Sequence, residues 1–404
     1  MEFPQNLKLG FIGSRSAFVD ERGTVWTEAG LARPLALLAQ QCGKLTLALS
    51  LAPGRQPLHD HALPEAIDFL PLTWMPSLSS GIRQISKTRR VVREVERRSD
   101  AVIVQIPFDS PLALLRARRP RVYHVIGDVW GVARYGTHYG GWKRLPALAA
   151  GGAIDRLYYC LLRRSDSRAV VNGAELFEHF GSPRGRSVVS ATMFRGEIMS
   201  VRRSRSVDAP FRVLFVGNFR REKGIDTLLD AFGQLLQHVP DSELDIVGTP
   251  HTVDREVSSE IEKGLKALEA KAVVRFLGHR AFGPELFRCF ADADVLAAPS
   301  RAEGTPRVLL EARAFGCPVI ATPVGGVRSS VTDEHDGLLV PHDDPGALKD
   351  CFLRIKKDHD LRRRLIQHGL ERARQTTVEE LADALAGEVE ALRCKNGRLT
   401  NRYN

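Results

Sequence analysis

The sequence lacks several features that would point to particular classes of protein. Its six cysteines, in 404 residues, are scattered and show none of the short spacings of zinc sites or redox motifs. We therefore expect buried, reduced thiols in a cytoplasmic protein. Residues 7–12 are too short for the apolar region of a signal peptide, and no cleavage pattern follows them. The most apolar longer stretch, residues 145–162, contains Asp155 and Arg156, so no transmembrane segment is expected.

Charge is distributed unequally between the two halves of the chain. Residues 1–200 hold 27 Lys and Arg against 17 Asp and Glu, whereas residues 201–404 hold 31 of each, so the whole net charge of +10 is N-terminal. An acidic partner for the first half is one interpretation, and an Arg-rich proteome is the other. Nucleic acid is not expected as the partner, because no aromatic RNA-binding platform or recognition-helix motif accompanies the basic excess.

Short apolar segments alternate with longer amphipathic ones along the chain, which predicts parallel sheets wrapped by helices. In the first half we expect strands at residues 7–12, 44–49, 66–70, 101–106, 122–126 and 169–171. We expect helices there at residues 27–41, 82–98, 145–164 and 174–180. In the second half we expect strands at residues 211–216, 243–247, 273–276, 295–298 and 318–321.

This alternation predicts two doubly wound α/β units of similar size. We expect an N-terminal unit over residues 1–200, a linker over residues 201–210 and a second unit over residues 211–375. A C-terminal helix over residues 376–394, which could cross back to the first unit, and a disordered tail over residues 395–404 complete the chain. Ligands of such sheets bind at the carboxyl ends of the strands, so the expected site is the cleft between the units.

The most informative stretch is residues 299–326, PSRAEGTPRVLLEARAFGCPVIATPVGG. It places Glu303 in a loop rich in Gly and Pro, and Glu311 eight positions later. Pro306 is suited to begin a helix between them, because its fixed φ fits the first turn and its missing N–H is not needed there. The helical rise from Pro306 to Glu311 is roughly 7 to 8 Å. Two carboxylates this far apart are suited to bind different hydroxyls of one elongated ligand, with its charged part against the helix N-terminus.

Two loops are candidate phosphate sites. Gly13 follows the first expected strand, and a glycine there lets the backbone approach a phosphate, although a simple turn is the alternative. The strand at residues 211–216 is followed by a loop with three cations, Arg220, Arg221 and Lys223. Cations at the carboxyl end of a first strand suit a diphosphate, and a solvated basic loop is the alternative.

Two other patterns have ordinary structural explanations beside the functional ones. Asp292 and Asp294 imitate a metal-binding pair, but a polar residue at a strand entrance needs no metal, so we expect a structural role. His124 lies near the carboxyl end of a strand, with Asp128 and Trp130 in the following loop. It is either a satisfied core residue or a catalytic one.

The segment 82–98, IRQISKTRRVVREVERR, predicts a basic amphipathic helix. One face carries the apolar residues Ile82, Ile85, Val92 and Val95, and the window 81–121 holds 11 cations and 4 anions. Such a surface can lie on an anionic membrane. Because the apolar stripe is narrow, an ordinary surface helix that covers a sheet is the alternative.

Residues 299–326 resemble the signature of family 4 retaining glycosyltransferases, with Glu303 and Glu311 in the E-x7-E pattern. Supporting segments in the family order are VGNFRREKGIDTLLDAF, RFLGHRAFGPELFRCFADADVLAAPS and DGLLVPHDDP. The match covers residues 211–345 and is weak in the first half. The resemblance implies the glycosyltransferase B architecture, an α/β fold with two Rossmann-like doubly wound domains facing across a cleft, which holds a nucleoside diphosphate sugar and needs no metal or other cofactor.

The resemblance also implies roles for individual residues. Glu303 would hold hydroxyls of the donor sugar, Glu311 the ribose hydroxyls, and Lys223 would neutralise the leaving diphosphate. The candidates for catalysis are Glu303, Lys223, Arg220 and His124. The donor-binding candidates are Gly13, Asn218, Arg221, Gly278, Gly304, Thr305, Val308, Leu309 and Glu311, and the acceptor-binding candidates are Asp128 and Trp130.

The sequence departs from the family pattern at two places. Asn218 stands where the family commonly has Arg, so Arg220 or Arg221 would have to replace that cation. The family's His near Ile126 or Gly127 is absent, and His124, on the same strand face as Ile126, is the candidate substitute.

The sequence therefore predicts a retaining glycosyltransferase that moves a sugar from a nucleoside diphosphate sugar to a hydroxyl of a glycan or lipid-linked acceptor, in cell-surface polysaccharide or glycolipid synthesis. We expect a cytoplasmic protein, with a peripheral position at the inner face of the membrane as a separate expectation that rests on residues 82–98. The alternatives are a nucleotide-sugar epimerase or hydrolase of the same fold and a non-catalytic nucleotide-sugar-binding protein.

Overall fold

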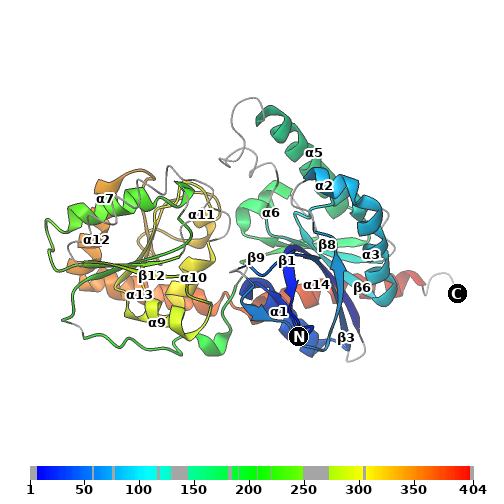
Figure 1. Cartoon of the computed structure of the whole chain (residues 1–404), viewed down its shortest axis with the longest axis horizontal. Coiled ribbons are helices and arrows are strands. Elements are labelled where there is room, and N and C mark those ends of the chain that lie inside the picture. Colours follow the sequence, from blue (N-terminus) through cyan, green and yellow to red (C-terminus); the bar gives the residue numbers. More distant parts are fainter. Residues whose placement is uncertain are drawn as a thin grey trace. The chain divides into compact units, whose positions relative to one another are not determined.

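The chain divides into two compact units, Met1–Thr192 together with Val378–Asn404, and Met193–Thr377. Both are drawn in Figure 1, from a computed structural model of the protein. The structure describes residues 7–56, 59–74, 78–115, 119–127, 129, 144–180, 184–189, 191–206, 208–219, 221–248, 273–303 and 306–400.

The first unit is built on a parallel sheet in the order β5-β3-β1-β6-β7-β8-β9. These strands are β1 (Lys8–Val19), β3 (Lys44–Leu51), β5 (Ile67–Leu72), β6 (Ala101–Ile106), β7 (Arg121–Val125), β8 (Ser167–Asn172) and β9 (Gly185–Val188). The far end of β1 pairs antiparallel with β2 (Val25–Thr27), which pairs with β4 (His61–Ala62). The strand order reverses between β1 and β6, which is where doubly wound sheets bind ligands.

Helices cover both faces of this sheet. They are α1 (Ala29–Gln41), α2 (Leu78–Arg83), α3 (Ile85–Arg98), α5 (Arg144–Leu162), α6 (Ala174–Phe180) and α14 (Val378–Thr400), with the 3-10 turn η1 (Pro111–Leu114). Because successive strand residues point to opposite faces, β6 divides its side chains between two clusters. Ile103 packs with α1 and α14, while Val102 and Val104 pack with α3 and α5.

The first strand differs from the sequence prediction. We expected it to end at Gly13, but β1 continues to Val19 through an irregularity between Ile12 and Ser16. Beyond this bulge the strand gains new partners, since Ser16 pairs with β3 and Phe18 with β2. These pairings keep this polar segment extended, although its local sequence does not predict a strand.

The second unit is a six-stranded parallel sheet in the order β12-β11-β10-β13-β14-β15. The strands are β10 (Arg212–Val216), β11 (Glu243–Val247), β12 (Val274–Gly278), β13 (Val295–Ala298), β14 (Val319–Ala321) and β15 (Leu338–Leu339). In chain order this is the Rossmann arrangement 3-2-1-4-5-6, and the order reverses between β10 and β13.

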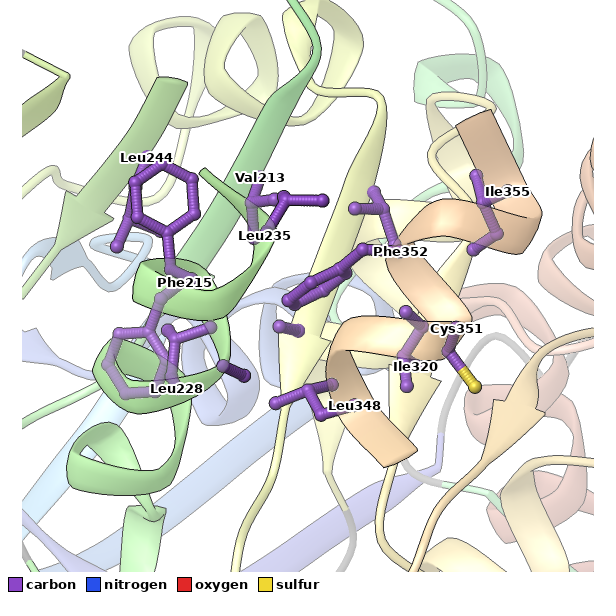
Figure 2. Close-up of a cluster of buried hydrophobic side chains, with 14 of the residues drawn as sticks. Val213, Phe215, Leu228, Leu235, Leu244, Ile320, Leu348, Cys351, Phe352 and Ile355 are labelled. Atoms are coloured by element: carbon purple, nitrogen blue, oxygen red, sulfur yellow. The ribbon is translucent and has the colours of Figure 1, made fainter. Parts of the chain in front are cut away.

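Helices pack on both faces of the second sheet as well. They are α7 (Ile225–Leu235), α9 (Pro284–Asp292), α10 (Arg307–Ala314), α11 (Val327–Ser330), α12 (Pro345–Lys357) and α13 (His359–Arg374). Figure 2 shows the core beneath α7 and α12, where Leu228 and Phe352 meet strand residues such as Phe215. Phe352 is fully buried, and removing so large a buried side chain typically costs about 3 to 5 kcal/mol of stability.

The expected linker, residues 201–210, belongs to the second unit. Ser204 donates hydrogen bonds from its backbone N–H and hydroxyl to the carboxylate of Asp292, at 2.7 to 3.0 Å. Arg203 lies 2.8 Å from Asp294, which also accepts a hydrogen bond from the backbone of Arg212. The polar composition that suggested a linker therefore reflects pairing with carboxylates some 90 residues away.

The C-terminal helix packs on the first unit, where Leu381, Leu385 and Val389 join the cluster that includes α1. Arg168 of β8 also forms an ion pair with Glu388. α14 continues to Thr400, so residues 395–400 are helical rather than the disordered tail that we expected. Extending α14 needs no new nucleation, which explains why the polar residues at its C-terminal end are helical as well.

Candidate functional site

Lys223 and Glu303 lie at the strand reversal of the second unit. Lys223 ends the short turn η4 (Arg221–Lys223) that follows β10, and Glu303 lies in the loop that follows β13. Because β10 and β13 are neighbours in the sheet, their loops meet at its carboxyl edge. Nζ of Lys223 lies 2.6 Å from Oε1 of Glu303. The structure thus brings together the two residues that the sequence assigned to the donor sugar and the diphosphate.

The Glu303 carboxylate is held from two sides. Besides Lys223, the hydroxyl of buried Ser300 donates to the same Oε1 at 2.8 Å. The Glu303 side chain is 11% exposed and that of Lys223 is 31% exposed. Among the residues that the structure describes, none donates to Oε2 of Glu303. One carboxylate oxygen therefore fixes the side chain, and the other is positioned to accept a hydrogen bond from a ligand hydroxyl.

Two glycines allow the loops around Glu303 to approach one another. Gly325 has a φ of 48°, and a Cβ there would lie 1.8 Å from the carbonyl oxygen of Glu303. Gly224 has a φ of 64°, and a Cβ there would lie 2.0 Å from the carbonyl oxygen of Pro299. Both the left-handed backbone and the lack of space exclude a larger residue. Backbone contact therefore sets the position of Glu303.

Arg301 links the same loops and was missed from the sequence. Its guanidinium binds both oxygens of Asp226, in the first turn of α7, at 2.9 and 2.8 Å. It also binds Asp343, and these two carboxylates raise the pKa of the guanidinium. The backbone N–H of Arg301 donates to the carbonyl of Glu222 at 2.7 Å. Its place two residues before Glu303 was the only sequence signal for this role.

α10 carries the second carboxylate. It begins at Arg307 with Pro306 as its N-cap, close to where the sequence predicted the helix start. Glu311 is 8% exposed and Leu309 is fully buried. Val308 lines a small pocket together with Lys223, Ser300, Glu303 and residues of β10 and β13.

A buried arginine anchors α10 to the loop after β14. Arg313 is 1% exposed and donates to the backbone carbonyls of Asp336 and Ser330, at 3.0 and 2.8 Å. Burial lowers its pKa to about 10. The Asp336 carboxylate accepts hydrogen bonds from Arg313 at 3.4 Å and from Arg372 at 2.9 Å, so these contacts join α10 and α13 to this loop.

The other donor-binding candidates have varied positions. Asn218 is exposed two residues after the end of β10, and Gly278 ends β12 with a φ of 68°. The backbone of Arg221 lies in η4, and its side chain is not among those that the structure describes. Five candidates lie outside the described residues: Arg220, Gly304, Thr305, Asp128 and Trp130. In the described ranges, no three His, Cys, Asp or Glu side chains are grouped so that they could hold a metal ion.

Gly13 lies in the bulge of β1 at the strand reversal of the first unit. A Cβ at Gly13 would lie 2.3 Å from Cδ2 of Leu49, so a larger residue would require Leu49 to move. Beside it, both the backbone N–H and the hydroxyl of Ser14 hydrogen-bond to Oε1 of Gln105 on β6. Packing and this polar bridge account for the glycine locally, so its approach to a phosphate stays a prediction.

His124 lies on β7, opposite Gln105 and Val170 of the neighbouring strands. The side chain is 4% exposed, and its Nε2 has no hydrogen-bond partner among the described residues. Burial lowers the pKa of the imidazole to about 4, because the charged form would lose its hydration. The ring is therefore neutral near pH 7, which is typical of a core histidine.

Asp109 is a second residue that the sequence analysis missed. It follows β6, three residues after the last strand residue Ile106, at the reversal between β1 and β6. Burial raises the pKa of its carboxyl to about 6, and the nearby cation Arg15 partly opposes this rise. Apolar residues surround Asp109 in the sequence, so the pattern did not indicate that it lies just beyond the carboxyl end of a strand.

Comparison with known families identifies the second unit. Residues 200–372 match the family model of the glycosyl transferases group 1. This segment is a group 1 glycosyltransferase domain. It contains Lys223, Glu303 and Glu311, and the family prediction made from the E-x7-E pattern is confirmed.

Curated relatives of this chain include D-inositol 3-phosphate glycosyltransferases. That of Corynebacterium urealyticum is 33% identical over 189 residues, which cover 46% of this chain and 44% of that protein. That of Paenarthrobacter aurescens is 30% identical over 231 residues, which cover 53% and 55%. The chain thus spans about half the length of the curated relatives that it matches.

Solved structures resemble the chain over almost its whole length. Anabaena HepE in complex with UDP and glucose has a TM-score of 0.66 at 19% identity, covering 95% of this chain and 100% of that one. WaaG, a glycosyltransferase involved in lipopolysaccharide biosynthesis, has a TM-score of 0.68 at 16% identity, covering 94% and 100%. These likenesses confirm the predicted fold, an α/β chain of the glycosyltransferase B class with two Rossmann-like units.

The close approach at Gly325 predicts a stability defect in the group 1 domain. Gly325→Ala should lower the free energy of unfolding by about 1 to 3 kcal/mol, because it adds backbone strain and a clash with the Glu303 carbonyl. Gly233→Ala, inside α7 with open space around it, should be neutral or stabilising by about 1 kcal/mol. Chemical denaturation of both variants measures the difference, and equal stabilities would contradict this account of the loop packing.

The pKa of Asp109 predicts a pH-dependent change in stability. Its folded-state pKa of about 6 lies above the value of 3.8 for an unfolded aspartate, so ionisation of the folded protein reduces stability as pH rises through 6. Asp109→Asn should therefore stabilise the protein at pH 8 by up to about 3 kcal/mol and have little effect below pH 4. Denaturation at both pH values tests this, with Glu65→Gln, an exposed carboxylate in the same unit, as the control. A variant no more stable than the wild type at pH 8 would show that Asp109 is well solvated.

Proposed function

We propose that the protein is a retaining glycosyltransferase that transfers a sugar from a nucleoside diphosphate sugar to a hydroxyl of a glycan or lipid-linked acceptor. The observation that carries this proposal is the pairing of Lys223 with Glu303 at the strand reversal of the group 1 domain. The inositol phosphate glycosyltransferases, HepE with UDP and glucose, and WaaG support the same class of reaction. We place it in the synthesis of a cell-surface polysaccharide or glycolipid.

Lys223 supplies the positive charge for the leaving group. As the bond from the anomeric carbon to the phosphate oxygen breaks, the diphosphate becomes more negative and the sugar becomes oxocarbenium-like. An ammonium group has three N–H donors, and Glu303 accepts only one of those of Lys223. The remaining donors can bind the diphosphate, and a fixed charge in a half-buried position lowers the barrier more than one in water. No metal ion is required for this step.

Glu303 positions both Lys223 and the donor sugar. Its Oε1 holds Lys223 in place, and its Oε2 accepts a hydrogen bond from a hydroxyl of the donor sugar. In this role the Glu303 carboxylate is engaged by two donors, Lys223 and Ser300, so it is a poor nucleophile. Retention then follows from attack of the acceptor on the face from which the diphosphate departs, with the diphosphate accepting the acceptor's proton.

The rest of the donor lies along α10. The N-terminal turn of this helix, after Pro306, presents backbone N–H groups that favour negative charge. Further along the helix, Glu311 binds the ribose hydroxyls. Arg313 and Arg301 contribute indirectly, because they anchor α10 and the Glu303 loop to their neighbours.

On the first unit, we assign acceptor-side chemistry to Asp109. Its carboxylate is ionised above pH 6 and can accept a hydrogen bond from a sugar hydroxyl. A half-buried carboxylate that reduces stability at neutral pH is more often retained at functional sites than elsewhere. Asp128 and Trp130 remain predicted acceptor contacts.

Removal of either member of the ion pair should slow sugar transfer. In Lys223→Ala and Glu303→Ala, turnover of the best donor from a panel of nucleoside diphosphate sugars should fall by about 100- to 1000-fold, the usual effect of losing one group that stabilises transition-state charge. Arg354→Met, which removes a cation from an exposed pair with Glu334 in the same unit, is the matched control and should keep its rate. Near wild-type turnover in both site variants would refute the assignment.

The stereochemistry of the product tests the mechanism separately. Proton NMR of the first product formed should show the same anomeric configuration as the donor sugar, because both bonds are on one face of the ring. Chelation of divalent ions should leave the rate unchanged. An inverted product would preserve the glycosyltransferase assignment and overturn the retaining mechanism.

A further inference from the structure

A wide cationic hollow lies beside the outer face of α3 in the first unit. Its volume is about 790 Å³. We call it the α3 surface, and it is lined by Ser86, Arg89, Arg90, Arg93, Glu94, Glu96, Arg97 and Arg119. Five of these eight residues are arginines and two are glutamates, so part of the N-terminal charge excess lies here.

The two acidic residues of the α3 surface are already paired. Glu96 turns inward and binds Arg121 at 2.8 Å, where both side chains are almost fully buried. Glu94 accepts hydrogen bonds from Arg97 and Arg98, and these bonds lower the pKa of Glu94 to about 2. Neither carboxylate is left to neutralise the other arginines of the surface.

Four arginines therefore keep an uncompensated charge. Arg89 donates to the carbonyl of Leu112 at 3.2 Å and Arg119 donates to the carbonyl of Glu96 at 3.3 Å, and neutral carbonyls do not cancel their charge. Arg90 and Arg93 have no carboxylate partner within the described ranges, and both are exposed. Together they form a cluster of like charge that favours a polyanionic partner.

The apolar face of α3 is not available to a membrane, which corrects the sequence expectation. Val92 is 2% exposed and Val95 is fully buried, and both pack in the core beneath the sheet. Val92 and Val95, the part of the stripe that lies near the end of α3, therefore cover the sheet, as in an ordinary surface helix. Any contact with lipid must use the polar face of α3.

Exposed apolar side chains lie on the elements beside that polar face. Ile82 of α2 is 64% exposed, Leu112 of η1 is 41% exposed and Leu115 is 36% exposed. α2 and η1 both contact α3, and α2 and α3 are neighbours in Figure 1. The hydrogen bond from Arg89 to the Leu112 carbonyl joins the cations to this apolar margin. Cations next to exposed aliphatic side chains are typical of surfaces that bind at a bilayer interface.

We propose that the α3 surface docks the protein onto an anionic lipid bilayer. Arg89, Arg90, Arg93 and Arg119 bind lipid phosphates, while Ile82, Leu112 and Leu115 enter the interfacial region. Several separate cations with apolar neighbours fit the many phosphates and the acyl boundary of a bilayer better than a single soluble phosphate. Within the described residues no helix is long and apolar enough to span a bilayer, so this docking is peripheral.

Co-sedimentation of the full chain with vesicles tests the proposal. Wild-type protein should bind vesicles of equal parts phosphatidylcholine and phosphatidylglycerol, should not bind phosphatidylcholine alone, and should dissociate as salt is raised. Arg90→Gln together with Arg93→Gln should lower partitioning on the order of 30-fold, since each cation near an anionic surface contributes about fivefold. Ile82→Ser with Leu112→Ser should lower it further.

The control has the same change in net charge at another site. Arg363→Gln with Arg364→Gln, both exposed on α13, should bind like the wild type. Failure of the wild type to bind anionic vesicles would overturn the proposal, and so would unchanged binding by the Arg90 and Arg93 variant. Stabilisation by inorganic phosphate without vesicle binding would assign the surface to a soluble phosphate instead. No sugar donor is present, so the result is independent of the proposed activity.

Discussion

Contact between backbones at the carboxyl edge of the second sheet is the constraint on which the site depends. Gly325 meets the carbonyl of Glu303, and Gly224 meets that of Pro299, at distances that exclude any side chain. The reversal of strand order makes β10 and β13 neighbours, so Lys223 and Glu303 meet although 80 residues separate them. Since loop backbones rather than long side chains set this geometry, the pair is ordered before any substrate arrives. Preorganised charge of this kind is what an enzyme needs to stabilise a leaving diphosphate.

Internal ion pairs explain where the charge of the chain is used. In the second unit, the carboxylates of Asp294 and Asp336 bind arginines and that of Asp292 binds Ser204, and these contacts hold segments against the sheet. In the first unit, Glu96 is used in the same way by Arg121. Glu94 and Glu96 of α3 are already paired, so they do not neutralise the outer arginines of this helix. A net charge counted from the sequence therefore understates how basic this one surface is.

The regular elements were largely predictable, because strands buried on both faces are continuous apolar segments with polar ends. β6, β11 and β13 have the bounds that the pattern indicated. The errors occur where a partner far away in the sequence decides the structure, as Asp292 does for Ser204 and β3 does for Ser16. The residues of the site also fall into a predictable and an unpredictable group. Glu303 and Lys223 belong to a local pattern, whereas the roles of Arg301 and Asp109 exist only once distant strands are side by side.

The first unit shows why a residue type on a strand does not fix a role. His124 was the candidate for a vacant family position, but its ring is buried, burial lowers its pKa to about 4, and none of the described residues bonds to its Nε2. Asp109 lies at the end of the adjacent strand, is less buried and ionises near pH 6. A carboxylate there can accept a hydrogen bond from a hydroxyl of the acceptor. In the proposed reaction, the first unit therefore contributes its chemistry from the end of β6 rather than from β7.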